Sequence, residues 1–185
     1  MAEKQSKNKW HTPAERIMML GFAAVILLGT ILLCLPVSAA DGKSVYWLDA
    51  LFTATTSVCV TGLVTVPTAT TWSTFGKIVI LGLIQFGGLG IMACLTMVFL
   101  ILRRKISLQS RKLIQDTYNL PVLKGSVGIV RKLLIGTAAV ELAGAFFYSF
   151  WFVPEYGFWK GIGYSLFHSV SAFCNAGIED RKSVV

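Results

Sequence analysis

Apolar stretches alternate with short polar turns along the whole of this chain. Three of the stretches, at residues 17–37, 78–102 and 133–153, are 21 to 25 residues long. About 20 apolar residues in succession are enough for a helix to cross the hydrocarbon core of a bilayer. The pattern therefore predicts three membrane-spanning helices in an all-α integral membrane protein.

Prolines mark the ends of two of these stretches. Pro36 disfavours helix at Leu35, and Pro154 directly follows the third stretch, so both helices are expected to end there. A basic N-terminus before an apolar stretch also describes a secretory signal, and Ala39-Ala40 could serve as its cleavage site. The apolar core of a signal is only about 7–15 residues long, so the first stretch is interpreted as a retained helix.

Two further apolar stretches, at residues 47–58 and 161–173, are too short to cross a bilayer. A helix of about 12 residues is about 18 Å long, roughly half the thickness of the hydrocarbon core. Such a helix has to return to the face from which it entered. Each stretch leads into a glycine-containing segment, at residues 59–63 and 174–178, so the sequence predicts two re-entrant loops.

The two short stretches match one another at a fixed spacing. Identical residues 115 positions apart are Leu51 and Leu166, Phe52 and Phe167, Cys59 and Cys174, and Gly62 and Gly177. Leu63 and Ile178 continue the match with similar residues, and the order of long stretch, polar turn, short stretch and glycine segment repeats as well. Internal repeats in membrane transporters place the functional site at the interface between the repeats. The two glycine segments are therefore the candidate site.

These segments suit the binding of a cation. An ion that loses its water shell needs a ring of oxygen ligands, which backbone carbonyls supply without a titratable charge. Extended backbone at membrane depth is tolerated where it lines a cavity or is buried in protein. Glycine permits positive φ angles, and the C-terminal ends of the short helices carry partial negative charge. Val60-Thr61-Gly62-Leu63 is therefore a candidate relative of the potassium-channel filter, with a re-entrant packing loop as the equal alternative.

Composition and charge agree with a membrane protein and exclude a soluble enzyme or a disordered chain. Hydrophobic residues make up 55% of the chain and charged residues 14%, against roughly 45–50% and 25% in soluble domains. Twelve of the 17 basic residues lie before the first long stretch or at residues 103–132. Cytoplasmic segments carry such an excess, so the N-terminus and residues 103–132 are predicted to be cytoplasmic, in a multi-pass protein of the inner (plasma) membrane.

Other partners and cofactors are not indicated. Nucleic acid is not expected to bind, because Tyr118 is the only aromatic residue among the basic residues of 103–132. The cysteines show no metal-site spacing and lie in apolar surroundings, where a free cysteine behaves as a small hydrophobe; they are Cys34, Cys59, Cys94 and Cys174. No bound cofactor or resident metal is therefore expected.

Isolated polar residues within the apolar stretches are further candidates. Glu141 is either a functional residue or a protonated or hydrogen-bonded packing glutamate. His168 is either a structural histidine or a pH sensor. Asp49 is either an N-terminal helix cap and dipole partner or an ion ligand. No spacing among the three suggests a paired acid and base, so an enzyme is not predicted.

Three motifs in order identify a family that the chain resembles. Residues 52–63 closely resemble the first pore loop of the Trk/Ktr superfamily of potassium uptake proteins. Residues 85–90 (Gln-Phe-Gly-Gly-Leu-Gly) resemble the glycine-rich stretch of its inner helix, and residues 167–177 resemble its second pore loop. The resemblance covers about residues 12–178 and is closest to the Ktr-type membrane subunit.

The resemblance implies inward transport of K⁺, with Na⁺ as a possible second ion, through one pore. Four repeats of outer helix, pore loop and inner helix would surround it, with one filter glycine per repeat. The implied partners are a second copy in a homodimer, a cytosolic nucleotide-binding regulatory subunit and the lipid bilayer. The implied ion-binding carbonyls are those of Val60, Thr61, Gly62, Leu63, Asn175, Ala176, Gly177 and Ile178. The candidates for a hinge or gate, with helix packing as the alternative, are Gly87, Gly88 and Gly90.

The chain holds one and a half of these four repeats. The expected order is a cytoplasmic N-terminus (1–16), a first repeat (17–102), a cytoplasmic hairpin linker (103–132), a truncated second repeat (133–178) and a non-native tail (179–185). The last six residues match what a common sequencing adapter encodes in one frame, so the chain is interpreted as a fragment that supplies only part of the pore. A genuine short subunit is the alternative. The alternative function is a non-transporting membrane scaffold whose re-entrant loops serve packing.

Overall fold

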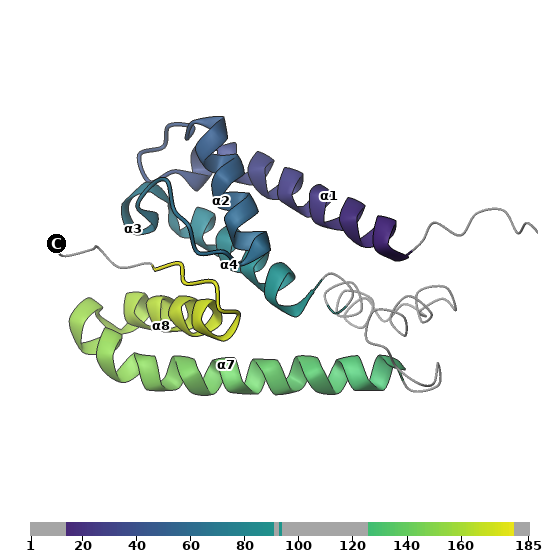
Figure 1. Cartoon of the computed structure of the whole chain (residues 1–185). Coiled ribbons are helices and arrows are strands. Elements are labelled where there is room, and N and C mark those ends of the chain that lie inside the picture. The colour runs from purple at the N-terminus through teal and green to yellow at the C-terminus, as the bar shows by residue number, and fades with distance from the viewer. Residues whose placement is uncertain (1–13, 91–92, 94–125, 180–185) are drawn as a thin grey trace, which may run out of the picture.

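The structure, a computed structural model, describes residues 14–90, 93 and 126–179 (Figure 1). Its elements are α1 (Ala14–Cys34), the short 3-10 helix η1 (Pro36–Ser38), α2 (Trp47–Cys59), α3 (Thr68–Thr71), α4 (Thr74–Leu89), α7 (Ser126–Tyr156) and α8 (Phe158–Phe173). Within these described ranges no strand forms, and the only β-type pairing is an isolated bridge between Ala39 and Trp72. The mostly helical fold class is therefore confirmed.

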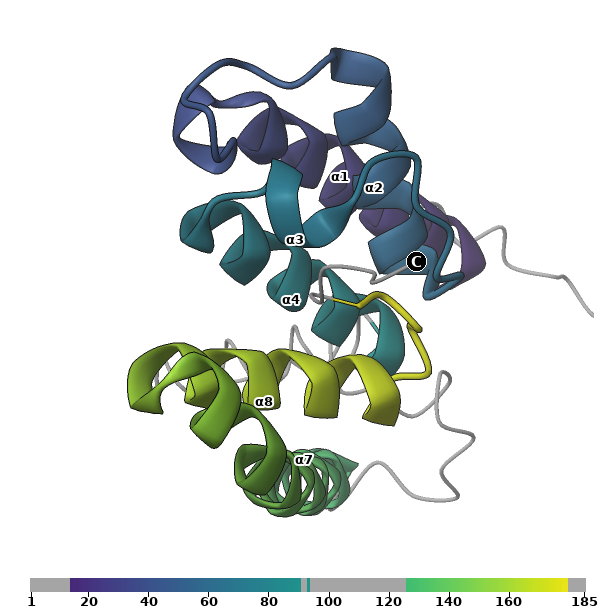
Figure 2. The same cartoon turned by 90° about the vertical axis from the view of Figure 1, so that its left-hand side faces the viewer.

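The helices pack as two groups that meet at α4 and α8. Helices α1, α2 and α4 contact one another, and α8 folds back along α7 after a turn at Gly157 (Figures 1 and 2). Gly157 has a φ of 80°, a conformation that favours glycine. Contacts between α4 and α8 join the two groups, so the segments that follow α2 and α8 come to lie close together.

Both short stretches form helices, as predicted. Helix α2 ends one residue later than the predicted range 47–58, and α8 begins three residues before the predicted residue 161. Helix α1 ends at Cys34, and Leu35 has an extended backbone with ψ of 140°, which confirms the effect expected of the following proline.

The prediction that the third long stretch ends before Pro154 is wrong. Pro154 lies inside α7, which continues to Tyr156. Pro154 has no N–H to donate to the carbonyl four residues before it, and α7 ends two residues after it. The following turn is retained, since the Gly157 N–H donates to the Val153 carbonyl at 3.0 Å.

The prediction of one continuous helix over residues 78–102 is also wrong. Helix α4 begins earlier, at Thr74, and ends at Leu89, because Gly90 adopts a φ of 81°. Apart from residue 93, the rest of that range, together with residues 106–125 of the predicted hairpin, lies outside the described residues. Among the described helices, α7 alone contains a segment long and apolar enough to cross a bilayer, Gly128–Tyr156, while Met18–Cys34 and Thr74–Leu89 are shorter apolar segments.

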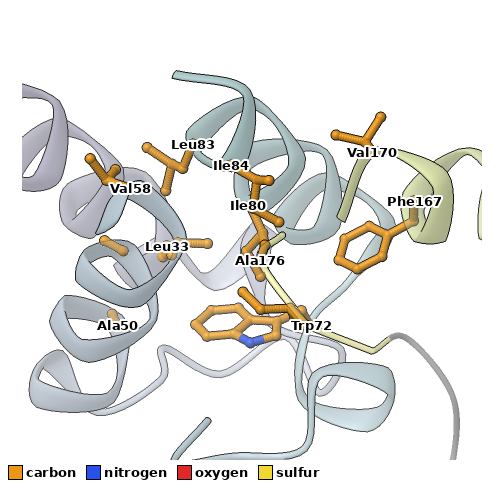
Figure 3. Packing of buried hydrophobic residues seen from close by; sticks show 12 residues of the cluster. Leu33, Ala50, Val58, Trp72, Ile80, Leu83, Ile84, Phe167, Val170 and Ala176 are labelled. Carbon is orange, nitrogen blue, oxygen red and sulfur yellow. The ribbon is translucent and has the colours of Figure 1, made fainter. Parts of the chain in front are cut away.

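The apolar core lies between α1, α2 and α4 and extends to α8 and the segment after it (Figure 3). Its buried members are Leu33, Ala50, Ala54, Val58, Trp72, Ile80, Leu83, Ile84, Phe167, Val170, Ala176 and Ile178. Large apolar side chains remain exposed on the outer faces of α1 and α7, among them Leu27, Phe147 and Trp151. Exposed apolar surface of this extent is typical of a face that contacts lipid or protein.

Candidate functional site

The first loop, residues 60–63, leaves α2 with a sharp change of backbone direction. Val60 adopts the left-handed conformation (φ 55°, ψ 42°) and donates its N–H to the Thr56 carbonyl. The Thr61 N–H donates to the same carbonyl at 3.0 Å, and Gly62 again has a positive φ of 76°. The Leu63 N–H donates to the Thr56 hydroxyl at 3.0 Å, so one α2 side chain holds the end of the loop.

The second loop, residues 175–178, repeats this backbone. Asn175 and Gly177 have φ angles of 59° and 65°. The Ala176 N–H donates to the Ser171 carbonyl at 2.7 Å, and the Ser171 hydroxyl donates to the Ile178 carbonyl at 2.9 Å. Each of these residues lies 115 positions after its counterpart in the first loop. The repeat seen in the sequence is therefore present in the backbone conformation as well.

The two loops lie against one another. A Cβ added to Gly62 would collide with the carbonyl oxygen of Ala176 and lie 3.6 Å from the Gly177 Cα. A cavity of about 810 Å³ borders both Gly62 and Gly177 and is otherwise lined by residues 64–70 and Glu179. The structure therefore brings the two predicted segments together beside a hollow that is large enough for a hydrated ion.

The eight predicted carbonyl residues differ in exposure. Thr61, Leu63, Asn175 and Gly177 are exposed, Val60 and Gly62 are half-buried, and Ala176 and Ile178 are buried. Ile178 differs from its counterpart Leu63, because its carbonyl already accepts the Ser171 hydroxyl. One lone pair of that carbonyl is therefore engaged.

Two glycines near the end of α4 pack against the ends of α2 and α8, where the two loops begin. A Cβ on Gly87 would collide with the Val58 carbonyl, and a Cβ on Gly88 would lie 2.7 Å from the Cβ of Cys174. A Cβ on Gly90 would meet none of the described residues within 4 Å, and the positive φ of Gly90 ends the helix. Gly87 and Gly88 thus occupy close-packing positions in this structure, whereas Gly90 lies at the end of the helix.

A partly buried polar contact lies behind the second loop. The Gln85 amide nitrogen on α4 donates to both carboxylate oxygens of Glu141 on α7, at 2.8 and 2.7 Å. The Cys174 thiol donates to the Gln85 amide oxygen at 3.4 Å. In the sequence Gln85 stands out only as the first residue of the 85–90 motif, although a lone amide in an uncharged apolar stretch is a signal of its own. Its partner lies 56 residues away, which no local pattern reveals.

The other two polar candidates, His168 and Asp49, lie on the short helices α8 and α2. His168 Nδ1 lies 2.9 Å from the Tyr164 carbonyl, and the ring packs 4.9 Å from that of Phe152. The prediction that Asp49 is the N-cap of α2 is wrong, because Tyr46 is the N-cap. Asp49 lies in the first turn, where a negative charge interacts favourably with the helix dipole. Among residues 14–90, 93 and 126–179, no group of three or more His, Cys, Asp or Glu side chains could hold a metal ion.

Comparison with known proteins gives one family match that covers nearly the whole chain. The family described as "TrkH: Cation transport protein" matches residues 6–181. The chain is 42% identical, over 95% of its length, to the Ktr system potassium uptake protein B of Bacillus subtilis. It is 41% identical, again over 95%, to the potassium/sodium uptake protein NtpJ of Enterococcus hirae. It is 37% identical, over 94%, to the Ktr system potassium uptake protein B of Vibrio alginolyticus.

The chain is much shorter than these relatives. It spans 39% of the first, 39% of the second and 37% of the third. The similarity therefore concerns one part of each relative.

Proposed function

Since this chain belongs to the TrkH family of cation transport proteins, which are membrane proteins and not enzymes, we propose that it forms two of the walls of a potassium uptake pore. The observation that carries the proposal is the contact between the two loops. Gly62 lies against the Ala176 carbonyl. Each of the two loops follows a short helix, and each has the same alternation of positive φ angles. Two extended segments side by side can direct their carbonyls toward one cation.

The proposed ion ligands are the backbone carbonyls of residues 60–63 and 175–178. The short helices α2 and α8 end at these loops, so the partial negative charge of each C-terminus favours a cation there. The names of three relatives include potassium, and that of the Enterococcus hirae protein also includes sodium. K⁺ is therefore the proposed ion, and Na⁺ is its competitor.

Each proposed repeat consists of an outer helix, a pore loop and an inner helix. Helices α1 and α7 are the outer helices, α2 and α8 with their loops form the pore loops, and α4 is the first inner helix. Two walls cannot enclose an ion. Because the chain spans 39% of its Bacillus subtilis relative, we place it in a longer transporter that supplies two more repeats. By the family resemblance this transporter is a homodimer that binds a cytosolic nucleotide-binding regulatory subunit.

The orientation in the membrane follows from the charge distribution. The N-terminus and residues 103–132 carry most of the basic residues, and such segments remain in the cytoplasm. The turn at residues 38–46 and the turn around Gly157 then face the exterior of the plasma membrane. Ions would enter the loops from that side.

A joined transporter tests the proposal directly. In it, residues 1–178 replace the matching part of the Bacillus subtilis relative. The proposal expects the joined transporter to restore growth of a potassium-uptake-deficient bacterium on low K⁺. The matched control carries Gly62→Ser and Gly177→Ser together, which should abolish this growth. A joined transporter that inserts into the membrane in normal amounts and yet transports no K⁺ would favour the scaffold alternative.

A further inference from the structure

The contact between Gln85, Glu141 and Cys174 connects three helices behind the second loop. Glu141 is only 6% exposed, and a buried carboxylate is costly unless it is hydrogen-bonded. Both of its oxygens accept from Gln85. The same turn of α7 is fixed a second time, because the Ser169 hydroxyl on α8 donates to the Glu141 backbone carbonyl at 2.6 Å.

The hydrogen bonds of this contact have a defined direction. The NH₂ group of Gln85 faces Glu141, whose two carboxyl oxygens both accept from it. The amide oxygen of Gln85 is then left facing Cys174, whose thiol is a donor. The two bonds to Glu141 thus fix which end of the Gln85 amide Cys174 meets, and the contact passes from α7 through α4 to Cys174, directly before the second loop.

Cys174 lies next to the residues proposed to bind the ion. It caps α8 with its N–H bonded to the Val170 carbonyl at 2.9 Å, and Gly88 packs against its side chain. Two residues further along, the Ala176 carbonyl meets Gly62 of the first loop. A displacement of Cys174 would therefore move the carbonyl that sits between the two loops.

We propose that Glu141 and Gln85 are positioning residues for ion selection: through Cys174 they hold the second loop in register with the first and so set the discrimination of K⁺ against Na⁺. This inference rests on the proposed function. Carbonyl ligands discriminate between cations by their number and placement, which makes selectivity the property that a shifted loop changes first. A glutamate that only joined the helices would affect the amount of folded protein and leave selectivity unchanged.

The test compares single and exchanged variants of the joined transporter. The variants are Glu141→Gln, Gln85→Glu, and both together, which restores a carboxylate-amide pair with the two ends exchanged. The measurement is the concentration of Na⁺ that halves K⁺ uptake, which does not depend on how much protein is present. Each single variant should weaken discrimination on the order of tenfold, the scale of one hydrogen bond to a charged group, and the exchange should recover most of the loss.

Cys174 provides a second test that leaves the contact between Gln85 and Glu141 in place. Cys174→Ala removes the donor to Gln85 and should weaken K⁺ discrimination, whereas Cys174→Ser keeps a donor and should preserve it. Glu155→Gln is the matched control, because Glu155 lies on the same helix and is exposed; its selectivity should equal that of the unsubstituted protein.

The outcomes separate this inference from the proposed function. If the unsubstituted transporter selects K⁺ and the Glu141, Gln85 and Cys174→Ala variants select it equally well, the positioning role is refuted and the proposed function stands. The positioning role is also refuted, and the proposed function stands, if the exchange does not restore the selectivity that Glu141→Gln and Gln85→Glu lose and Cys174→Ser loses as much selectivity as Cys174→Ala. If the unsubstituted transporter does not select K⁺, the proposed function fails and the positioning role fails with it.

Discussion

Val60 and Asn175 are 115 residues apart and hold the same left-handed backbone conformation, with φ angles of 55° and 59°. Two residues after each, Gly62 and Gly177 also have positive φ. Left-handed backbone is costly for residues other than glycine, asparagine and aspartate. Such strain persists where the surrounding structure imposes it, and it is concentrated at functional sites. Of these four residues only Val60 carries that strain, but the left-handed conformation recurs at the same place in both loops and marks them as equivalent parts of the molecule.

The left-handed conformation of Asn175 gives a first prediction. Asn175→Val places a β-branched side chain in this conformation and should lower the free energy of unfolding by about 1–2 kcal/mol. Asn175 is exposed, so little burial changes with the substitution. Thermal unfolding of the purified chain in detergent measures the effect. Asn175→Gly is the control, and equal stability of the valine and glycine variants would contradict the assigned backbone.

Two glycines of α4 should respond to alanine in opposite directions. Gly88→Ala brings a methyl group to 2.7 Å from the Cys174 Cβ and should destabilise the chain by about 1–3 kcal/mol. Gly82 lies in the same helix with nothing within 4 Å of an added Cβ, so Gly82→Ala should stabilise it by about 0.5–1 kcal/mol. Thermal unfolding in detergent compares the two variants. A destabilising effect of the same size in both would argue against close packing between α4 and the second loop.

The hydroxyl of Ser171 holds the end of the second loop. Ser171→Ala leaves the buried Ile178 carbonyl without its donor, and a buried acceptor without a partner costs about 1–3 kcal/mol. Ser149→Ala is the control, since that hydroxyl bonds only within α7, to the Phe146 carbonyl, and should change stability little. Equal losses in the two variants would show that the Ser171 bond contributes nothing particular to the loop.

Much of the fold follows from local patterns in the sequence. The length of each apolar stretch predicted both short helices, and the residue before Pro36 ends α1 as expected. The 115-residue repeat located both loops without any knowledge of their contact. These features depend on neighbouring residues or on exact repetition, so they can be read along the chain.

Other features depend on contacts that are distant in sequence. The run at residues 78–102 is uncharged throughout, so its composition does not show where α4 ends. The helix ends at Leu89, because Gly90 adopts a positive φ. Gln85 acquires its significance from Glu141, 56 residues away. Gly87 and Gly88 have two alternative roles in the sequence, and only the positions of Val58 and Cys174 show that they pack against the ends of α2 and α8.

The orientation in the membrane can be tested on the chain itself. Single cysteines at Lys43, Gln109 and Lys160 are introduced into a background without other cysteines. The positive-inside distribution predicts that an impermeant thiol reagent labels positions 43 and 160 in intact cells. Position 109 should react only after permeabilisation. Labelling of position 109 in intact cells would reverse the orientation and the side from which the loops are entered.

The most direct test of the account is the Na⁺ concentration that halves K⁺ uptake by the joined transporter with Gly62→Ser or Gly177→Ser. Both substitutions oppose a positive φ, and Gly62→Ser also forces a Cβ against the Ala176 carbonyl. Gly42→Ser is the control, because Gly42 has a φ of 67° with open space around it, outside both loops. We predict weakened discrimination of K⁺ in both loop variants, more severe for Gly62→Ser, and none in the control. Unchanged discrimination in both loop variants would contradict the assignment of these loops as the ion filter.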